Sequence, residues 1–260
     1  MQTCSAADSG WSGTRRQWLL GSLAALATPL WAQEPVALTL ASTEFPPYTG
    51  ERLAGGGFLT RAIRLAFERS GYAPTTHFYP WTRALKMTHS GEVDGITAIW
   101  RTAEREQWLA FSDPIVSNDI GFYGLTERGL LVRELADVKA HGLRVGVVRG
   151  YAVPKLLLAL QPQFVETLDD AAGLRMLAAK RMDLVLIDRA VAHYLLHGPL
   201  AALQSSLGWQ HLVVQSLPLH MALRRDSPRQ VQLLAAFNTG LAAITADGTL
   251  ARLKKDYGLA

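Results

Sequence analysis

The chain has 260 residues, of which 49% are hydrophobic and 18% are charged. This length and balance exclude a disordered chain and are typical of one large or two medium folded domains. The formal net charge of +4 comes without any Lys/Arg run longer than two residues, which argues against nucleic-acid binding. The single cysteine, Cys4, excludes an internal disulfide and a cysteine-based metal site.

Residues 1–32 are predicted to form an export signal. Arg15 and Arg16 precede the apolar run WLLGSLAALATPLWA, which is too short to span a membrane and ends on the small residue Ala32. The segment TRRQWLL resembles a twin-arginine signal, and an ordinary secretory signal that contains two arginines is the alternative. We therefore expect a periplasmic protein from which residues 1–32 are removed.

From Val36 on, strand-like and helix-like segments alternate. The helix within 55–72 is indicated by Leu59, Ile63 and Phe67 at helical spacing, and Gly71 ends it. The first series comprises a strand at 36–42, a proline-rich loop at 43–50, this helix, a strand at 77–81 that ends in a turn, a helix at 81–91 and a strand at 93–99.

A second series follows the same plan. It comprises a strand at 143–148, a turn at 149–154, helices at 154–160 and 169–181, a strand at 182–188, and two closing helices at 227–244 and 248–258. In both series a methionine near a helix end precedes, by seven residues, an aspartate that opens an apolar strand: Met87 and Asp94, then Met176 and Asp183. The alternation predicts an α/β fold with mainly parallel sheets, and the repetition favours two lobes over one continuous sheet.

Five segments in order resemble the family 3 periplasmic solute-binding proteins of ABC transporters, the polar amino-acid-binding type. They are TEFPPYTG, GEVDGITAIWRTAEREQWLAFSDPI, LRVGVVRG, DLVLIDRAV and DGTLARLKKDYG. The most specific element is Thr102-x-x-Arg105 followed by Phe-Ser-Asp-Pro. The resemblance implies a two-lobed α/β clamshell (type II), in which each lobe is a mainly parallel sheet flanked by helices.

The resemblance also implies how the chain divides. Lobe 1 would comprise residues 33–118 plus 219–260, and lobe 2 would comprise residues 119–218. The chain would cross between the lobes at two hinges, near 118–122 and 215–219. A ligand would lie in the cleft and favour the closed arrangement of the two lobes.

Arg105 is the first candidate ligand contact. A planar guanidinium matches a carboxylate bidentately, and the resemblance implies that this arginine binds the ligand α-carboxylate. The alternative is a surface ion pair with Glu104 or Glu106. Arg101 is a possible further contact, or otherwise a surface charge at the rim of the cleft.

Asp188 ends the apolar strand at 182–188, at the carboxyl end where α/β sheets present ligands. The resemblance implies that an acid here binds the ligand ammonium, and an N-cap for the following helix is the alternative. Phe45 and Trp81 stand where the family places two rings around the ligand side chain, although Trp81 could instead pack in the core. Tyr48 is a possible third ring.

The sequence departs from the family pattern at two places. Thr97 and Ala98 would supply main-chain groups and one hydroxyl, but the hydroxyl residues common in the family at positions 98 and 100 are missing. After Gly150, Tyr151 and Ala152 replace the usual Ser/Thr pair, so the backbone amides remain and a phenol enters the site. This favours a differently shaped anion, or a ligand with a ring or an extended tail, over an ordinary α-amino acid.

We therefore expect a monomeric extracytoplasmic solute-binding protein, not an enzyme, that needs no cofactor or metal. It would capture an amino acid or a related carboxylate and deliver it to an ABC-type permease. A periplasmic enzyme on the same fold, such as a cyclohexadienyl-type dehydratase, is the alternative. Its acid–base candidates are Glu44, His77, Glu166 and His193, none of which lies in a recognisable catalytic motif. A ligand-sensing partner of a membrane receptor is the third reading.

Overall fold

The computed structural model describes residues 36–259, so the predicted export signal lies outside the described residues. In this part of the chain the strands form one hydrogen-bonded sheet in the order β2-β1-β3-β9-β5-β8-β6-β7, and β4 pairs with β9. The strands are β1 (Val36–Ser42), β2 (Tyr72–Phe78), β3 (Gly95–Trp100), β4 (Leu109–Phe111), β5 (Val116–Leu125), β6 (Arg144–Val148), β7 (Gln163–Thr167), β8 (Leu184–Asp188) and β9 (Leu207–Arg224).

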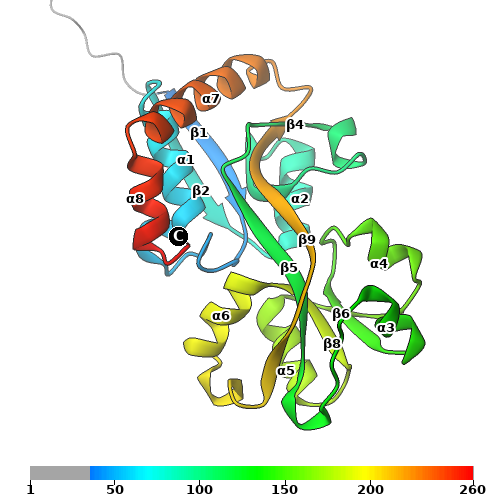
Figure 1. Cartoon of the computed structure of the whole chain (residues 1–260). Coiled ribbons are helices and arrows are strands. Elements are labelled where there is room, and N and C mark those ends of the chain that lie inside the picture. The colour runs from blue at the N-terminus through cyan, green and yellow to red at the C-terminus, as the bar shows by residue number, and fades with distance from the viewer. Residues whose placement is uncertain (1–35, 260) are drawn as a thin grey trace, which may run out of the picture. The chain divides into compact units, whose positions relative to one another are not determined.

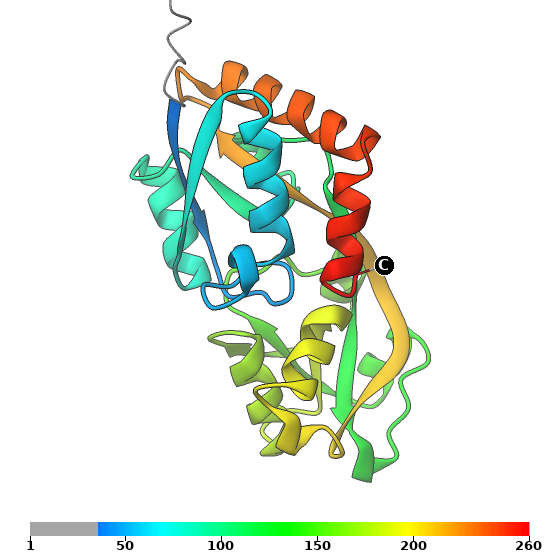
Figure 2. The same ribbon diagram turned by 90° about the vertical axis from the view of Figure 1, so that its left-hand side faces the viewer.

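Helices cover both ends of this sheet (Figure 1). The helices are α1 (Phe58–Glu68), α2 (Trp81–Ser90), α3 (Leu135–Ala140), α4 (Lys155–Ala159), α5 (Asp170–Ala178), α6 (Arg189–His197), α7 (Gln230–Ala246) and α8 (Thr249–Asp256). Short 3-10 turns occur at η1 (Ala54–Gly56), η2 (Arg105–Gln107), η3 (Thr126–Arg128) and η4 (Ala201–Leu203). Helices α1, α2, α7 and α8 lie with β1 to β4, whereas α3 to α6 lie with β6 to β8 (Figures 1 and 2).

The two ends are parallel sheets joined by two long antiparallel strands. β1 pairs in parallel with β2 and β3, and β6 pairs in parallel with β7 and β8. β5 and β9 run side by side from one end to the other and pair from Val116 opposite Leu219 to Leu125 opposite Leu207 (Figure 1). This confirms the expected two-lobed α/β architecture with two crossings. The repetition favours two lobes over one continuous sheet, but β5 and β9 join the two parallel sheets into one. The expected hinges at 118–122 and 215–219 lie within β5 and β9, and the limits of the lobes stay a prediction.

The core at the first end forms between α1 and α7. α1 buries Leu59, Ile63 and Phe67, which recur at helical spacing as predicted, and it also buries Phe58. Fully burying each such side chain contributes roughly 1.5–3 kcal/mol of transfer free energy. The two helices approach so closely that a Cβ on Gly240 would lie 1.8 Å from the carbonyl oxygen of Ala66. Only glycine therefore fits this crossing.

The strand predicted at 77–81 is wrong in its position, because β2 spans Tyr72–Phe78. Pro74 lies inside this strand, which argued against a strand there. However, β2 is the edge of the sheet and its exposure alternates along the chain. A proline is tolerated at an edge because no neighbouring strand needs its missing N–H.

None of the helices in residues 36–259 is, by itself, long and apolar enough to cross a membrane. Taken together, α7 and α8 meet the criteria of length and composition, but only as a pair bent by 78°.

Candidate functional site

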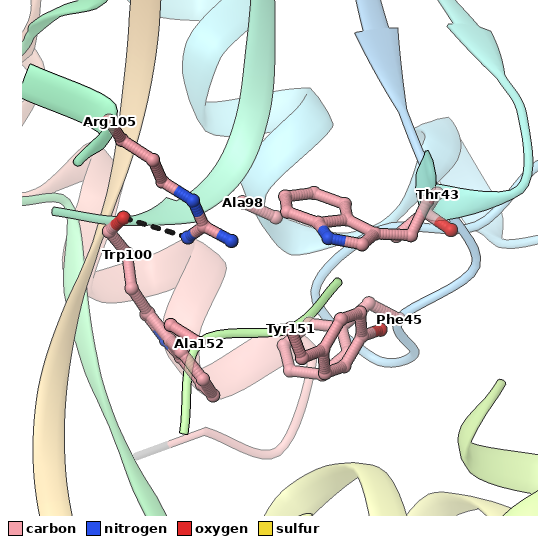
Figure 3. Close-up of a pocket in the computed structure, with 8 residues that line it drawn as sticks. Thr43, Phe45, Ala98, Trp100, Arg105, Tyr151 and Ala152 are labelled. Carbon is pink, nitrogen blue, oxygen red and sulfur yellow. Dashed lines mark hydrogen bonds between the residues drawn. The ribbon is translucent and has the colours of Figure 1, made fainter. Parts of the chain in front are cut away.

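A pocket forms where the loops that follow β1, β3 and β6 meet. We call it the first hollow; it encloses about 290 Å³, its open mouth included (Figure 3). Its lining residues come from both ends of the sheet: Thr43, Phe45, Trp81, Ala98, Trp100, Arg105, Tyr151 and Ala152. Five of the seven firm candidates line this hollow: Phe45, Trp81, Ala98, Arg105 and Tyr151. Thr97, Asp188 and the two possible contacts, Tyr48 and Arg101, do not.

A β-bulge turns Ala98 toward this hollow. The pairing of β3 with β9 shifts register between Ile96 and Ile99, and Ala98 has a φ of +54°, which is uncommon for a residue with a side chain. Thr97 faces the other way, because it is fully buried and its hydroxyl donates to Oγ of Ser42 at 2.8 Å. The structure therefore brings Ala98 to the hollow and leaves the side chain of Thr97 outside it.

Arg105 is a buried cation in the first hollow. Its Nη1 donates to the carbonyl oxygen of Trp100 at 3.0 Å (Figure 3). Its Nη2 donates to the carbonyl oxygen of Gly150 at 3.2 Å. Burial lowers the pKa of Arg105 to about 10, so the group stays charged at neutral pH. No carboxylate of residues 36–259 forms an ion pair with it.

Three of the five N–H donors of this guanidinium therefore remain for another acceptor. A buried cation without a paired anion is costly, so the arrangement favours an anionic ligand. Arg101 behaves differently: it does not line the hollow, its side chain is 59% exposed, and its Nε donates to Glu106 at 2.6 Å. The position of Arg101 thus fits the second alternative given for it, a surface charge, rather than a contact in this hollow.

Tyr151 lies at the centre of an aromatic cluster. Its ring meets those of Trp81, Phe45 and Trp100 edge to face, with centroids 5.5, 6.1 and 6.3 Å away. Trp81 is fixed by its Nε1, which donates to the carbonyl oxygen of Gly150 at 2.8 Å. The guanidinium carbon of Arg105 lies 5.3 Å from the Trp81 ring centroid, within range of a cation–π contact.

A second hollow adjoins the first and shares Phe45, Trp100, Tyr151 and Ala152 with it. Asp188 lines this second hollow and is 2% exposed. Its Oδ1 accepts from the N–H of Val191 at 2.7 Å and caps α6, as the alternative predicted. Its Oδ2 accepts a longer bond, 3.4 Å, from the hydroxyl of Tyr48.

Asp188 therefore caps α6 and also lines a hollow beside that of Arg105, so the two predicted roles do not exclude each other. Burial raises the pKa of Asp188 to about 6, while the hydrogen bonds that it accepts from Val191 and Tyr48 oppose the rise. Tyr48 does not line either of these two hollows but stacks on Phe45, with ring centroids 5.3 Å apart.

Sequence reasoning missed Asp170, which lines the second hollow and is 4% exposed. Its Oδ2 accepts from the hydroxyl of Tyr151 at 3.2 Å. Burial, together with the nearby charge of Asp188, raises the pKa of Asp170 to about 7. A signal was present: two aspartates open α5, and Asp169 alone caps it by accepting from Ala172 at 2.6 Å. The second acid was therefore free for another role.

The four acid–base candidates of the enzyme alternative are all exposed, and none lines either hollow. Glu166 pairs with Arg149 at 2.7 Å, and Glu44 accepts from the N–H of Glu51 at 2.9 Å. Within residues 36–259 no group of three or more His, Cys, Asp or Glu side chains could hold a metal ion.

Comparisons with known proteins agree with this geometry. The model of the bacterial extracellular solute-binding proteins, family 3, matches residues 38–260. No curated protein matches the chain at a significant level. Among solved structures, the GluR0 ligand-binding core from Nostoc punctiforme in complex with L-glutamate is 20% identical, with a TM-score of 0.72, and the match covers 86% of this chain and 100% of that one.

Two further structures share the fold. A histidine kinase sensor domain with similarity to periplasmic binding proteins is 19% identical, with a TM-score of 0.76 over 86% of this chain and 96% of that one. An ancestral amino-acid-binding protein, described as a precursor of cyclohexadienyl dehydratase, is 18% identical, with a TM-score of 0.70 over 85% of this chain and 95% of that one.

Proposed function

The chain belongs to the bacterial extracellular solute-binding proteins of family 3, and from that premise we propose that it captures an amino acid or a related small carboxylate between its two lobes. Lobe 1 would comprise residues 33–118 plus 219–260, and lobe 2 residues 119–218. The observation that carries the proposal is the buried, unpaired cation of Arg105 in a hollow lined from both ends of the sheet.

The remaining predicted contacts suit such a ligand. Arg105 would bind the carboxylate, and Asp188 in the adjoining hollow would bind an ammonium group. Phe45, Trp81 and Tyr151 would enclose the apolar part of the ligand. Ala98 would contribute main-chain groups. Thr97 would act only by holding β3 in place, through the hydrogen bond from its hydroxyl to Ser42.

Delivery to an ABC-type permease by a monomeric protein outside the cytoplasm is the end use that we propose. A ligand-dependent contact with a membrane receptor is the second candidate, because a histidine kinase sensor domain has the same fold. The two uses share the ligand site and differ only in the membrane partner.

An enzyme is a third candidate, favoured by one observation. Asp170 and Asp188 are buried carboxyl groups with pKa values of about 7 and about 6, the range in which a general acid works near neutral pH. Incubating the protein with cyclohexadienyl acids and analysing the products by mass spectrometry tests this candidate. Unchanged compounds support binding alone.

Calorimetry with purified protein tests the binding proposal. Amino acids and small organic acids are first screened by thermal shift, because a ligand that binds the native state raises Tm. For each ligand found, Arg105→Gln should weaken binding by at least about 30-fold, since it removes a buried charge partner. Arg101→Gln is the matched control, because that arginine is exposed and paired with Glu106, and its Kd should stay within about threefold of the wild type. Equal affinities for Arg105→Gln and the wild type would overturn the assignment.

A further inference from the structure

Among the described residues that line the second hollow there are two buried carboxylates and no cationic side chain. Asp170 and Asp188 both line it, 4% and 2% exposed. They arrive from different elements, Asp170 from the first turn of α5 and Asp188 from the end of β8. No lysine, arginine or histidine within residues 36–259 forms an ion pair with either of them.

The hydrogen-bond donors to Asp170 and Asp188 do not neutralise the negative charge of these two carboxylates. Asp170 accepts from the phenol of Tyr151 at 3.2 Å, and Asp188 accepts from Val191 and Tyr48. These donors are neutral, and buried carboxylates normally pair with a cation or lose their charge. Asp183, by contrast, has such a partner, because it pairs with Arg144 at 3.0 Å.

The charges of the two hollows can be counted together, because the hollows share four lining residues. Arg105 supplies one positive charge, whereas Asp170 and Asp188 supply two negative charges. An amino acid with a neutral side chain would satisfy Arg105 and one aspartate only. The second aspartate would then stay buried without a cation.

We infer that Asp170 binds a second cationic group on the ligand, so that this site selects an amino acid with a positively charged side chain. The inference rests on the proposed function and names its substrate class. The ligand carboxylate meets Arg105, its ammonium meets Asp188, and its side-chain cation replaces or joins the Tyr151 hydroxyl at Asp170. Tyr151 and its aromatic neighbours flank the path of the side chain and suit a cation, which rings attract.

Matched ligands test the inference on the wild-type protein. L-arginine and L-citrulline have nearly the same shape, but only arginine has a charged side chain. At pH 8, calorimetry should show arginine binding at least about 100-fold more tightly than citrulline, because citrulline leaves a buried carboxylate unpaired. L-lysine and L-ornithine should also exceed L-glutamine. Citrulline binding as tightly as arginine, with lysine and ornithine no better than glutamine, would overturn the inference and leave the proposed function standing.

Asp170→Asn locates the selectivity. The variant should lose most of the arginine affinity, so that the preference for arginine over citrulline falls to within about threefold. Glu166→Gln is the control, because it removes one negative charge from an exposed pair in the same lobe and should keep the full preference. If Asp170→Asn retains the preference for arginine, Asp170 is not the contact. Absence of binding for every amino acid tested, charged or neutral, would instead contradict the proposed function.

The pH dependence supplies a readout that needs no variant. The groups that face Asp170 are Tyr151, Asp169 and Asp188, and Tyr48 faces Asp188. Because a protonated Asp170 cannot pair with a cation, and burial places its pKa at about 7, the preference for arginine over citrulline should fall roughly tenfold between pH 8 and pH 6. The direct effect of titrating Asp188 is the same for both ligands and cancels in this ratio. Its remaining effect acts through the pKa of Asp170. A ratio that stays constant contradicts the role of Asp170.

Discussion

The carbonyl oxygen of Gly150 accepts a hydrogen bond from Nη2 of Arg105 at 3.2 Å. The same oxygen accepts from Nε1 of Trp81 at 2.8 Å, so one peptide group of the loop after β6 holds two side chains of the opposite end of the sheet. The hydrogen bond links Arg105, the candidate anion-binding residue, to the loop of the opposite lobe. A ligand that binds Arg105 must therefore act at the point where the lobes meet.

Gly150→Ala should weaken ligand binding and lower the free energy of unfolding by about 1–2 kcal/mol. Gly150 has a φ of +78°, and an added Cβ would lie 3.3 Å from Cδ1 of Trp81. Gly129→Ala is the control, because its φ is +59° and nothing lies within 4 Å of its added Cβ. Urea denaturation should show a lower free energy of unfolding in both variants, whereas calorimetry should show weaker ligand binding only in Gly150→Ala. Equal Kd values in the two would contradict this role of Gly150.

Asp183→Asn should destabilise the protein by about 2 kcal/mol at pH 7. Desolvation alone would raise the pKa of Asp183, but hydrogen bonds from Arg144 and Arg128 lower it to about 2. Because the folded pKa lies below the unfolded value, this stabilisation is present above about pH 4 and is lost as pH falls through 2. The side chains of Arg128 and Arg144 are 38% and 35% exposed, so solvent screens their charges. The expected loss of stability is therefore kept small.

Urea denaturation of Asp183→Asn and wild type between pH 7 and pH 3 measures this difference. The difference in the free energy of unfolding between the two proteins should become smaller as the pH falls. Asp226→Asn is the control, because its ion pair with Arg224 leaves its side chain 75% exposed, and it should change stability little at any pH. A gap for Asp183→Asn that is the same at pH 7 and pH 3 would contradict the assigned pKa.

Much of the fold could be predicted because its signals are local. Helical spacing placed α1, and apolar runs placed β1, β3, β6 and β8. The strand β2 was misplaced because Pro74 opposes a strand locally, and only its place at the sheet edge makes that residue acceptable. The long strands β5 and β9 were not predicted, and the resemblance implied only two crossings within them. Strand pairing across about ninety residues has no local signature.

The site was predicted in part for the same reason. Arg105, Phe45 and Trp81 carry recognisable local motifs, and the structure brings them into one hollow. Asp170 lies eighteen residues before Asp188 in the chain, and only the packing of α5 against β8 shows that they line the same space. The bulge that turns Ala98 inward and Thr97 outward depends on pairing with β9, which the sequence of β3 alone cannot show.

Asp170→Asn should raise the free energy of unfolding of the ligand-free protein at pH 8, by at least about 1 kcal/mol. Burial raises the folded pKa of Asp170 to about 7, above the unfolded value, so ionising this group costs stability as pH rises from about 4 to 7. The advantage of the variant should therefore shrink toward pH 4.5. Thermal unfolding at pH 4.5, 6 and 8 measures it, and Glu166→Gln, an exposed carboxylate, should show no such trend. A variant less stable than the wild type at pH 8 would contradict the uncompensated charge.

Gly240→Ala should lower the free energy of unfolding by about 1–3 kcal/mol. Within a helix such as α7, alanine is intrinsically better than glycine by about 1 kcal/mol, so a net loss requires a steric cost larger than that gain. The added Cβ would lie 1.8 Å from the carbonyl oxygen of Ala66 and 2.6 Å from its carbonyl carbon, and this backbone of α1 cannot rotate away as a side chain could. The helices must therefore move apart and lose contact between Phe67 and Phe237, whose ring centroids lie 5.2 Å apart.

Thr239→Ala is the control for this crossing, because Thr239 is exposed on the same helix and its replacement changes helix propensity without a clash. Urea denaturation should show Thr239→Ala at or slightly above wild-type stability and Gly240→Ala clearly below it. Ligand affinity should be unchanged in both, since neither residue lines either hollow. If Gly240→Ala were as stable as Thr239→Ala, α1 and α7 would have to cross at a greater distance than the structure shows.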